Sequence, residues 1–280
     1  MDCYGVMGNP VAHSKSPWIH ARFAQLTGHA LTYNAHLVVV DGFAQAVQDF
    51  RAAGGKGCNV TVPFKFEAAA LPGLQLSARA AQEGACNTLR FDGETLIGDN
   101  TDGIGLVRDI TVNAGTRLAG SRVLLVGAGG AGAGVLGPLL ETAPASLVVA
   151  NRSPDKASRL VAGHADLAAR HGVALSACAL DDVGTAYDIV INASASSLTG
   201  QASPVAARAL RAGTLAYDLM YGPGAQEFLD WARQHGAQAR DGLGMLVEQA
   251  AESFAIWRGV VPPAGLVLVE LRQWLARPAP

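Results

Sequence analysis

Short apolar segments alternate with amphipathic segments of helical period along most of the chain, and Gly, Pro, Asn or Asp separates them. The apolar runs predict strands at four places in the N-terminal part: 3–7, 32–39, 58–62 and 85–90. A helical pattern begins at Pro17 with Ser16 as a candidate N-cap, and a second one opens at Asp41 and ends at Gly54. This alternation is typical of an α/β fold built on parallel-type sheets.

The polar, glycine-containing stretch at 98–105 interrupts the alternation, and a second strand–helix series begins near residue 122. We therefore expect a first domain at 1–102 and a second at 103–242. Five apolar residues near the C-terminus recur at alternating intervals of four and three, which predicts a buried helical face: Leu243, Val247, Ala250, Phe254 and Trp257. We expect this last segment, about 243–280, to complete the first domain.

The second series opens with a strand that runs directly into a glycine-rich turn and a helix. The turn consists of Gly127, Ala128, Gly129, Gly130 and Ala131. Gly127 permits the tight turn, Gly129 allows a pyrophosphate to approach the backbone, and the helix N-terminus offers N–H groups to the anion. The pattern favours a dinucleotide-binding Rossmann domain, with a merely tight βα turn as the alternative.

The end of the next strand bears on the choice of cofactor. An NAD site usually has Asp or Glu there, because the carboxylate accepts a hydrogen bond from the ribose 2′-hydroxyl. This chain has Asn151, Arg152 and Ser153, with Lys156 close behind. A guanidinium pairs with a 2′-phosphate, so these residues favour NADP. A solvated basic turn is the alternative.

Composition and charge narrow the class of partner. Half of the 280 residues are apolar and 16% are charged, which is enough apolar material for a sizeable core. The formal net charge of −2 comes without a basic face or run, which argues against nucleic acid and favours a small-molecule partner. The cysteines lie far apart without a CxxC pair, so we expect reduced thiols and no metal site: Cys3, Cys58, Cys86 and Cys178.

The chain shows neither an apolar run of about 18 residues nor the pattern of a signal peptide. We therefore expect no membrane segment and a cytoplasmic location. The oligomeric state is left open between monomer and homodimer.

Nine short motifs follow one another in the order seen in shikimate dehydrogenases. From Met1 to about Val260 the chain resembles that family in GNPVAHSKSP, GKGCNVTVPFK, GACNTL, GDNTDGIG, VGAGGAG, NRS, INAS, YDLMY and DGLGMLVEQA. The resemblance implies an N-terminal substrate domain and a Rossmann NADP-binding domain, each with an open parallel-type sheet. It also implies NADPH-dependent, reversible reduction of 3-dehydroshikimate to shikimate in the biosynthesis of aromatic amino acids.

The resemblance identifies Lys65 and Asp102 as the catalytic acid/base pair, in contact with the substrate. A strand that ends at Pro63 does not easily continue as a ladder, so Lys65 is expected at the carboxyl edge of a sheet, where ligands bind in open α/β folds. Asp102 lies in a glycine-bounded loop. Without the family motifs, Lys65 could be a surface lysine and Asp102 a helix N-cap.

The implied substrate is a small ring with one carboxylate, several hydroxyls and one ketone. Ser14 and Ser16 present two hydroxyls beside a helix start and are expected to bind the carboxylate, with a capping role for Ser16 as the alternative. His13 has no carboxylate partner in the local sequence, which favours a structural role. The other substrate contacts implied by the family are Thr61, Asn87, Tyr221 and Gln249. For Gln249, a position on the helix surface is the alternative.

On the cofactor side, the resemblance implies that Ala193, Leu219 and Gly242 line the nicotinamide pocket. Two segments depart from the family pattern. SASS at 194–197 lacks an expected glycine, and GPGAQEF at 222–228 replaces a threonine-containing turn. These departures concern the affinity for ligands more than the type of reaction.

Two other functions are alternatives to this reaction. A quinate/shikimate dehydrogenase often uses NAD, and the absence of an acid at 151–153 argues against it. A catalytically silent NADP-binding regulator has no need of an acid/base pair, so the presence of both Lys65 and Asp102 argues against that function.

Overall fold

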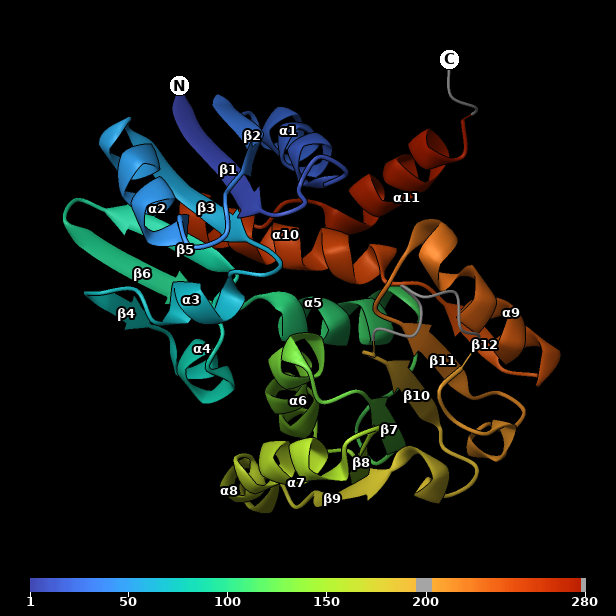
Figure 1. Cartoon of the computed structure of the whole chain (residues 1–280). Coiled ribbons are helices and arrows are strands. Elements are labelled where there is room, and N and C mark those ends of the chain that lie inside the picture. The colour runs from blue at the N-terminus through green and yellow to red at the C-terminus, as the bar shows by residue number, and fades with distance from the viewer. Residues whose placement is uncertain (195–202, 278–280) are drawn as a thin grey trace. The chain divides into compact units, whose positions relative to one another are not determined.

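The computed structural model describes residues 1–194 and 203–277. The chain divides into two units, of which unit 1 comprises Met1–Gly105 and Leu246–Pro280 and unit 2 comprises Leu106–Met245. Figure 1 shows the elements of both units. The chain passes from unit 1 to unit 2 within helix α5 (Asp102–Arg108) and returns within helix α10 (Leu243–Arg258).

The sheet of unit 1 has six strands in the order β2-β1-β3-β5-β6-β4. Their bounds are β1 (Asp2–Gly8), β2 (Leu31–Leu37), β3 (Gly55–Val60), β4 (Leu74–Leu76), β5 (Thr88–Asp92) and β6 (Thr95–Asp99). Strands β1, β2 and β3 are parallel, as the alternating pattern predicts, whereas β5 runs antiparallel to both β3 and β6. The reversal between β5 and β6 is made by a tight hairpin in which Gly93 has a φ of 57°.

The helices of unit 1 come from its N-terminal part and from the C-terminal segment. They are α1 (Ser16–Thr27), α2 (Phe43–Ala52), α3 (Lys65–Ala69), α4 (Ala78–Glu83) and α11 (Ala264–Leu275), together with the parts of α5 and α10 within unit 1. The apolar face expected from Leu243 onward is buried, with Val247, Ala250 and Phe254 fully excluded from solvent. Trp257, which continues this face, stacks on Tyr4 of β1 at 4.7 Å between ring centroids.

Unit 2 contains six parallel strands in the order β12-β11-β10-β7-β8-β9. They are β7 (Arg122–Val126), β8 (Ser146–Asn151), β9 (Ala174–Ala179), β10 (Ile189–Asn192), β11 (Leu215–Asp218) and β12 (Gln238–Arg240). Counted in chain order from β7, this is the 3-2-1-4-5-6 arrangement of the Rossmann fold. The helices are α6 (Gly130–Glu141), α7 (Pro154–Ala162), α8 (Ala165–Arg170) and α9 (Gln226–Gln234).

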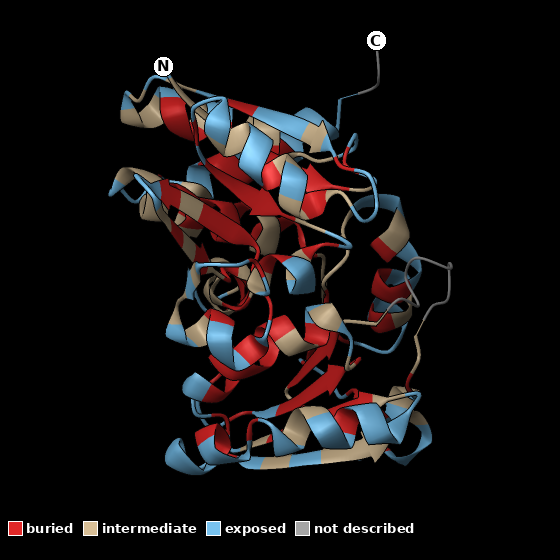
Figure 2. Cartoon of the chain, turned by 60° about the vertical axis from the view of Figure 1, so that its left-hand side comes forward, coloured by how far each residue is buried: buried red, intermediate tan, exposed pale blue. Residues whose placement is uncertain are grey.

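The central strands of unit 2, β7 and β10, are mainly apolar because helices cover both faces of a parallel sheet. Val123, Leu124 and Leu125 of β7 are fully buried, as are Ile189 and Ile191 of β10. Figure 2 shows buried residues concentrated on the strands. Among the described residues, no helix has both the length and the apolar character needed to cross a bilayer.

A buried carboxylate joins several segments of unit 2. Asp109, fully excluded from solvent, accepts hydrogen bonds from Arg240 Nε at 2.7 Å and from the Tyr217 hydroxyl at 2.7 Å. Arg240 Nη2 donates to the other oxygen at 2.5 Å, so the ion pair is bidentate. A Cβ on Gly244 would lie only 1.8 Å from Asp109 Oδ1, so the start of α10 approaches the carboxylate closely. This contact requires glycine at position 244.

Replacing Arg240 with Met should lower the free energy of unfolding by about 3 kcal/mol, because Asp109 would remain buried without its counter-charge. Urea unfolding measures the change. Arg233→Met is the matched control, since Arg233 pairs with Asp230 on the surface, where the two side chains are 54% and 51% exposed. Equal small effects of the two substitutions would show that the buried pair is not required.

Candidate active site

The central contact of unit 1 is an ion pair between Lys65 and Asp102, residues 37 positions apart in the chain. Lys65 is the first residue of α3, which follows the end of β3, and Asp102 is the first residue of α5. A carboxylate in the first turn of a helix is stabilised by the helix dipole. The side chains are 23% and 13% exposed, so the pair is partly buried but remains accessible.

Asn87 and Gln249 complete this cluster. Asn87 Nδ2 donates to Asp102 Oδ1 at 2.8 Å, while Lys65 contacts Oδ2, so both carboxylate oxygens have partners. The same amide nitrogen lies 3.4 Å from Gln249 Oε1. Gln249 is 8% exposed and donates to the Leu246 carbonyl at 2.8 Å, so it is not a helix-surface residue. Four of the residues expected from the sequence therefore form one hydrogen-bonded group.

A second layer of buried polar residues lies behind this group, and the sequence analysis did not anticipate it. Asn59 Nδ2 donates to Ser253 Oγ at 2.9 Å and to Thr88 Oγ1 at 3.0 Å. Asn59 Oδ1 accepts from the Tyr33 hydroxyl at 2.7 Å, and Ser253 Oγ lies 3.2 Å from Thr101 Oγ1. A polar residue within an otherwise apolar strand, such as Asn59, was the available signal.

The direction of the strands explains why these residues meet. Parallel β1 and β3 end at the same edge of the sheet, where the loop with Ser14 and Ser16 and the residue Thr61 follow them. Antiparallel β5 begins at that edge, immediately after Asn87, and β6 ends there shortly before Asp102. One edge of this sheet thus collects Ser14, Ser16, Thr61, Lys65, Asn87 and Asp102, which are six of the residues expected at the substrate.

The serine loop differs in one respect from expectation. Ser16 is the first residue of α1 rather than its N-cap, and the cap position belongs to Lys15, which makes no side-chain capping bond. The Ser16 N–H donates to Ser14 Oγ at 3.3 Å. The alternative role of Ser16, as the N-cap, is therefore wrong, because the helix begins one residue earlier than the pattern at Pro17 predicts.

In unit 2, the glycine turn follows β7. Gly127 has a φ of 113°, and a Cβ there would lie 2.8 Å from the backbone of Ala193, so only glycine fits. A Cβ on Gly129, in contrast, would meet no atom of the described residues within 4 Å. The packing of the described chain does not demand Gly129, and the open space beside it leaves room for a phosphate close to the backbone. Gly130 and Ala131 begin α6 and present the N–H groups of its first turn.

Asn151 connects the end of β8 to this turn. Its Oδ1 accepts from the Ala128 N–H at 3.1 Å, and its Nδ2 donates to the Ser153 carbonyl at 3.0 Å. Arg152, Ser153 and Lys156 are exposed beside it. The basic side chains are thus available for an anionic group next to the glycine turn.

The three residues expected at the nicotinamide follow the carboxyl ends of neighbouring strands of unit 2. Ala193 follows β10 and Leu219 follows β11. A Cβ on Gly242 would lie 2.1 Å from the Leu219 carbonyl, so the close approach of the two segments requires glycine.

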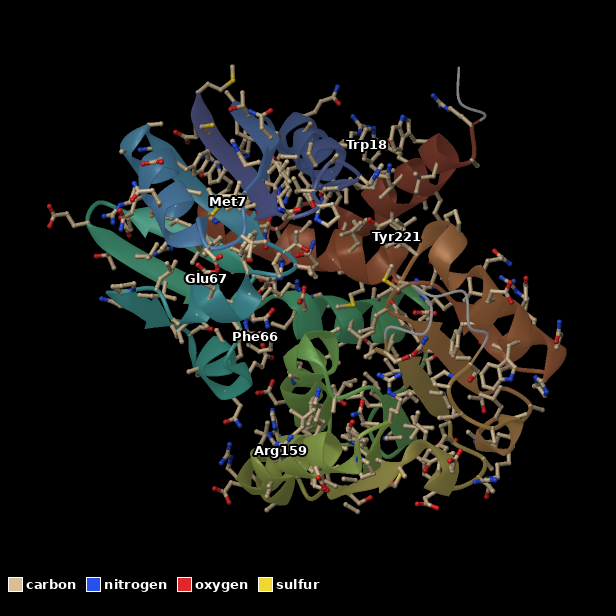
Figure 3. The ribbon with its side chains drawn as sticks, in the orientation of Figure 1. Met7, Trp18, Phe66, Glu67, Arg159 and Tyr221 are labelled. Carbon is tan, nitrogen blue, oxygen red and sulfur yellow. The ribbon has the colours of Figure 1, made fainter. Side chains whose placement is uncertain are left out.

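Tyr221 lies two positions after Leu219 (Figure 3). It belongs to unit 2, whereas the other residues expected at the substrate belong to unit 1. Of the segment 194–197, only Ser194 lies within the described residues.

Glu83, the last residue of α4, is a buried acid that the sequence analysis did not single out. It is 7% exposed, and neither carboxyl oxygen has a hydrogen-bond partner among the described residues. Burial raises the pKa of Glu83 to about 9, and the charge of Asp102 adds to the rise, while Arg79 opposes it. The Arg79 guanidinium pairs with Asp99 at 2.6 Å. Glu83 is therefore a neutral carboxylic acid at neutral pH.

This raised pKa has a consequence for stability. Unfolding returns the pKa of Glu83 to its ordinary value of 4.5. The stability that comes from protonated Glu83 is therefore complete below pH 4.5 and is lost as the pH rises through about 9. Glu83→Gln removes the titration, so the melting temperature of the variant should rise relative to the parent between pH 5 and pH 8.5. The corresponding difference in the free energy of unfolding should grow by at most about 1.4 kcal/mol per pH unit. Thermal melts across this range measure it.

Glu67→Gln is the control, because Glu67 is exposed on α3 (Figure 3). It should leave the difference between variant and parent independent of pH. A pH-independent difference for Glu83→Gln as well would show that Glu83 is ionised in the folded protein.

The parallel sheet of unit 2 with its glycine turn identifies the chain as a dinucleotide-binding α/β protein. Family models agree with this and add detail along the chain. The model described as shikimate dehydrogenase substrate binding domain matches residues 6–89. The model for shikimate / quinate 5-dehydrogenase matches 109–212, and that for the shikimate 5′-dehydrogenase C-terminal domain matches 242–269.

Individual relatives cover almost the whole chain. A protein of Methylibium petroleiphilum named shikimate dehydrogenase (NADP(+)) is 64% identical over 277 residues, covering 97% of this chain and 94% of that protein. The crystal structure of an Ael1 enzyme from Pseudomonas putida has a TM-score of 0.89 at 44% identity and covers 97% of this chain and 98% of its own. The chain belongs to the shikimate dehydrogenase family.

A second similar structure contains both ligands. Shikimate 5-dehydrogenase from Thermus thermophilus, in complex with NADP(H) and shikimate, has a TM-score of 0.84 at 29% identity. The alignment covers 98% of this chain and 99% of that one. Within the described ranges of the present chain, no group of three or more His, Cys, Asp or Glu side chains is arranged to hold a metal ion.

Proposed function

We propose that this chain catalyses the reversible reduction of 3-dehydroshikimate to shikimate with NADPH, in the cytoplasmic route to aromatic amino acids. The observation that carries the proposal is the Lys65–Asp102 pair, oriented by Asn87 in a partly buried site of unit 1. The relative with 64% identity, which is named shikimate dehydrogenase (NADP(+)), supports the choice of substrate and cofactor.

NADPH, when bound to unit 2, supplies the hydride that reduces the ketone carbon. The protein must then provide a proton for the oxygen. Lys65, protonated beside Asp102, donates that proton to the developing alkoxide and becomes a neutral amine, so the product is an alcohol. In the oxidation of shikimate, the neutral amine takes the proton back. Asp102 holds the ammonium in place, and Asn87 keeps the carboxylate oriented.

The remaining polar groups bind the parts of the ring that do not react. Gln249, adjacent to Asn87, offers its amide to a ring hydroxyl, and Thr61 offers its hydroxyl at the end of β3. Ser14 and Ser16 bind the carboxylate. Contacts remote from the ketone are similar in ground state and transition state, so they should affect KM more than kcat.

The cofactor assignment follows from the end of β8. Arg152 and Lys156 are exposed there, and Asn151 takes the place of the acid that would repel a 2′-phosphate. This arrangement argues against a quinate/shikimate dehydrogenase that uses NAD. The intact Lys65–Asp102 pair argues against a silent regulator.

Lys65→Ala should lower kcat for shikimate oxidation by about two to four decades, the usual contribution of a positioned acid/base. The affinity for NADP should change little, because Lys65 belongs to unit 1 and the glycine turn to unit 2. The melting temperature should also change little, because Asp102 is partly exposed and keeps its hydrogen bond from Asn87. Asp102→Asn should also lower kcat, and the double variant should lose far less than the product of the two losses. NADPH absorbance follows the reaction.

Lys56→Ala serves as control, since Lys56 is an exposed lysine of the same unit. Near-parental turnover of Lys65→Ala would overturn the mechanism.

Arg152→Ala should reduce the preference for NADP over NAD by about ten- to a hundredfold, through loss of a charge-assisted contact with the 2′-phosphate. Steady-state constants with both cofactors measure this preference. Arg159→Ala, an exposed arginine further along α7, should leave the preference unchanged (Figure 3). If Arg152→Ala weakened both cofactors equally, the phosphate would have to bind elsewhere.

A further inference from the structure

The C-terminal helix α11 packs against α1, the helix that follows the serine loop. Arg22 of α1 donates to both oxygens of Glu270, from Nε at 2.6 Å and from Nη2 at 2.7 Å. One turn away, the rings of Trp18 and Trp274 stack with centroids 5.8 Å apart and planes inclined by 24°. Figure 3 shows Trp18 on α1, on the side of α11. These contacts fix the last turn of α11 beside the start of α1.

The same tryptophan reaches the serine loop itself. The ammonium of Lys15 lies over the Trp274 ring, 5.2 Å from its centroid, which is the distance of a cation–π contact. Lys15 stands between Ser14 and Ser16, and the only basic side chain of the SKS sequence is therefore held by a residue of α11. Ser14 and Ser16 are neutral and leave the charge of a bound carboxylate uncompensated.

We propose that Trp274 is a positioning residue for substrate recognition: its ring holds the Lys15 ammonium at the serine loop, so that the loop meets the substrate carboxylate with a positive charge. The inference rests on the proposed function, because it concerns the carboxylate of that substrate. Lys15 contributes long-range attraction to the carboxylate, and the two serines contribute directed hydrogen bonds.

This arrangement predicts a specific pattern of kinetic effects. Trp274→Leu should raise KM for shikimate about two- to fivefold, as expected for an exposed cation–π contact, with kcat and KM for NADP unchanged. Lys15→Met should raise KM at least as far, and should weaken the rise of parental KM with salt concentration. The double variant should be no worse than Lys15→Met alone, because Trp274 acts through Lys15.

Three further variants separate this role from mere stabilisation of the helix. Trp274→Phe keeps an aromatic face and should restore most of the parental KM. Leu275→Ala removes a neighbouring side chain with the same 39% exposure as Trp274 and should leave KM unchanged. Glu270→Gln weakens the attachment of α11 through Arg22 without altering the Trp274 ring, and melting curves report the loss of docking for every variant.

Steady-state kinetics of these variants with shikimate and NADP test the inference. It is overturned if Trp274→Leu leaves KM unchanged, if its effect multiplies with that of Lys15→Met, or if Trp274→Phe is as impaired as Trp274→Leu. Absence of shikimate turnover in the parent would overturn the proposed function and this inference together. Parental turnover with any of the three contrary results would overturn the inference alone.

Discussion

The candidate site of unit 1 depends on the ion pair between Lys65 and Asp102, because the contacts of Asn87 and Thr101 hold its carboxylate in place. Its carboxylate has two oxygens and two partners, since Lys65 contacts one oxygen and Asn87 the other. Asn87 is itself held by Thr101, whose N–H donates to Asn87 Oδ1 at 2.9 Å. A lysine side chain has many rotamers in water, and this fixed acceptor reduces them to those that place the ammonium at the sheet edge. The position of the Lys65 ammonium therefore depends on the neutral amide of Asn87 as well as on the charge of Asp102.

Two buried carboxyl groups show how the surroundings decide the behaviour of one functional group. Asp109 receives hydrogen bonds from Arg240 and Tyr217, so its charge is compensated and stabilises the fold of unit 2. Glu83 receives no hydrogen bond from the described residues, and burial raises its pKa to about 9, so it stays protonated at neutral pH. A neutral Glu83 spares the site a second negative charge near Asp102. Lys65 thus pairs with one carboxylate and not with a cluster of them.

The chemistry of reduction is divided between the units in a way that matches their folds. The parallel sheet of unit 2 supplies a glycine turn whose backbone suits a phosphate, and its basic residues follow β8. The mixed sheet of unit 1 brings side chains to one edge, because the antiparallel β5 begins where β1 and β3 end. In the proposed function, unit 2 binds the cofactor through backbone groups and basic side chains, whereas unit 1 binds the particular substrate through side chains.

Local signals in the sequence determined the α/β class, the glycine turn, the cofactor preference and the family, because periodicity, turn residues and short motifs each lie within a few neighbouring positions. Those motifs also pointed to Lys65, Asp102 and Asn87. Features that depend on distant pairs follow from tertiary packing, such as the contact of Asn59 with Ser253, 194 positions away, and that of Lys15 with Trp274. Tertiary packing also decided the antiparallel direction of β5 and the protonation of Glu83. The direction of a strand is set by its neighbours in the sheet and a pKa by the solvent that packing excludes, and neither is encoded in the adjacent residues.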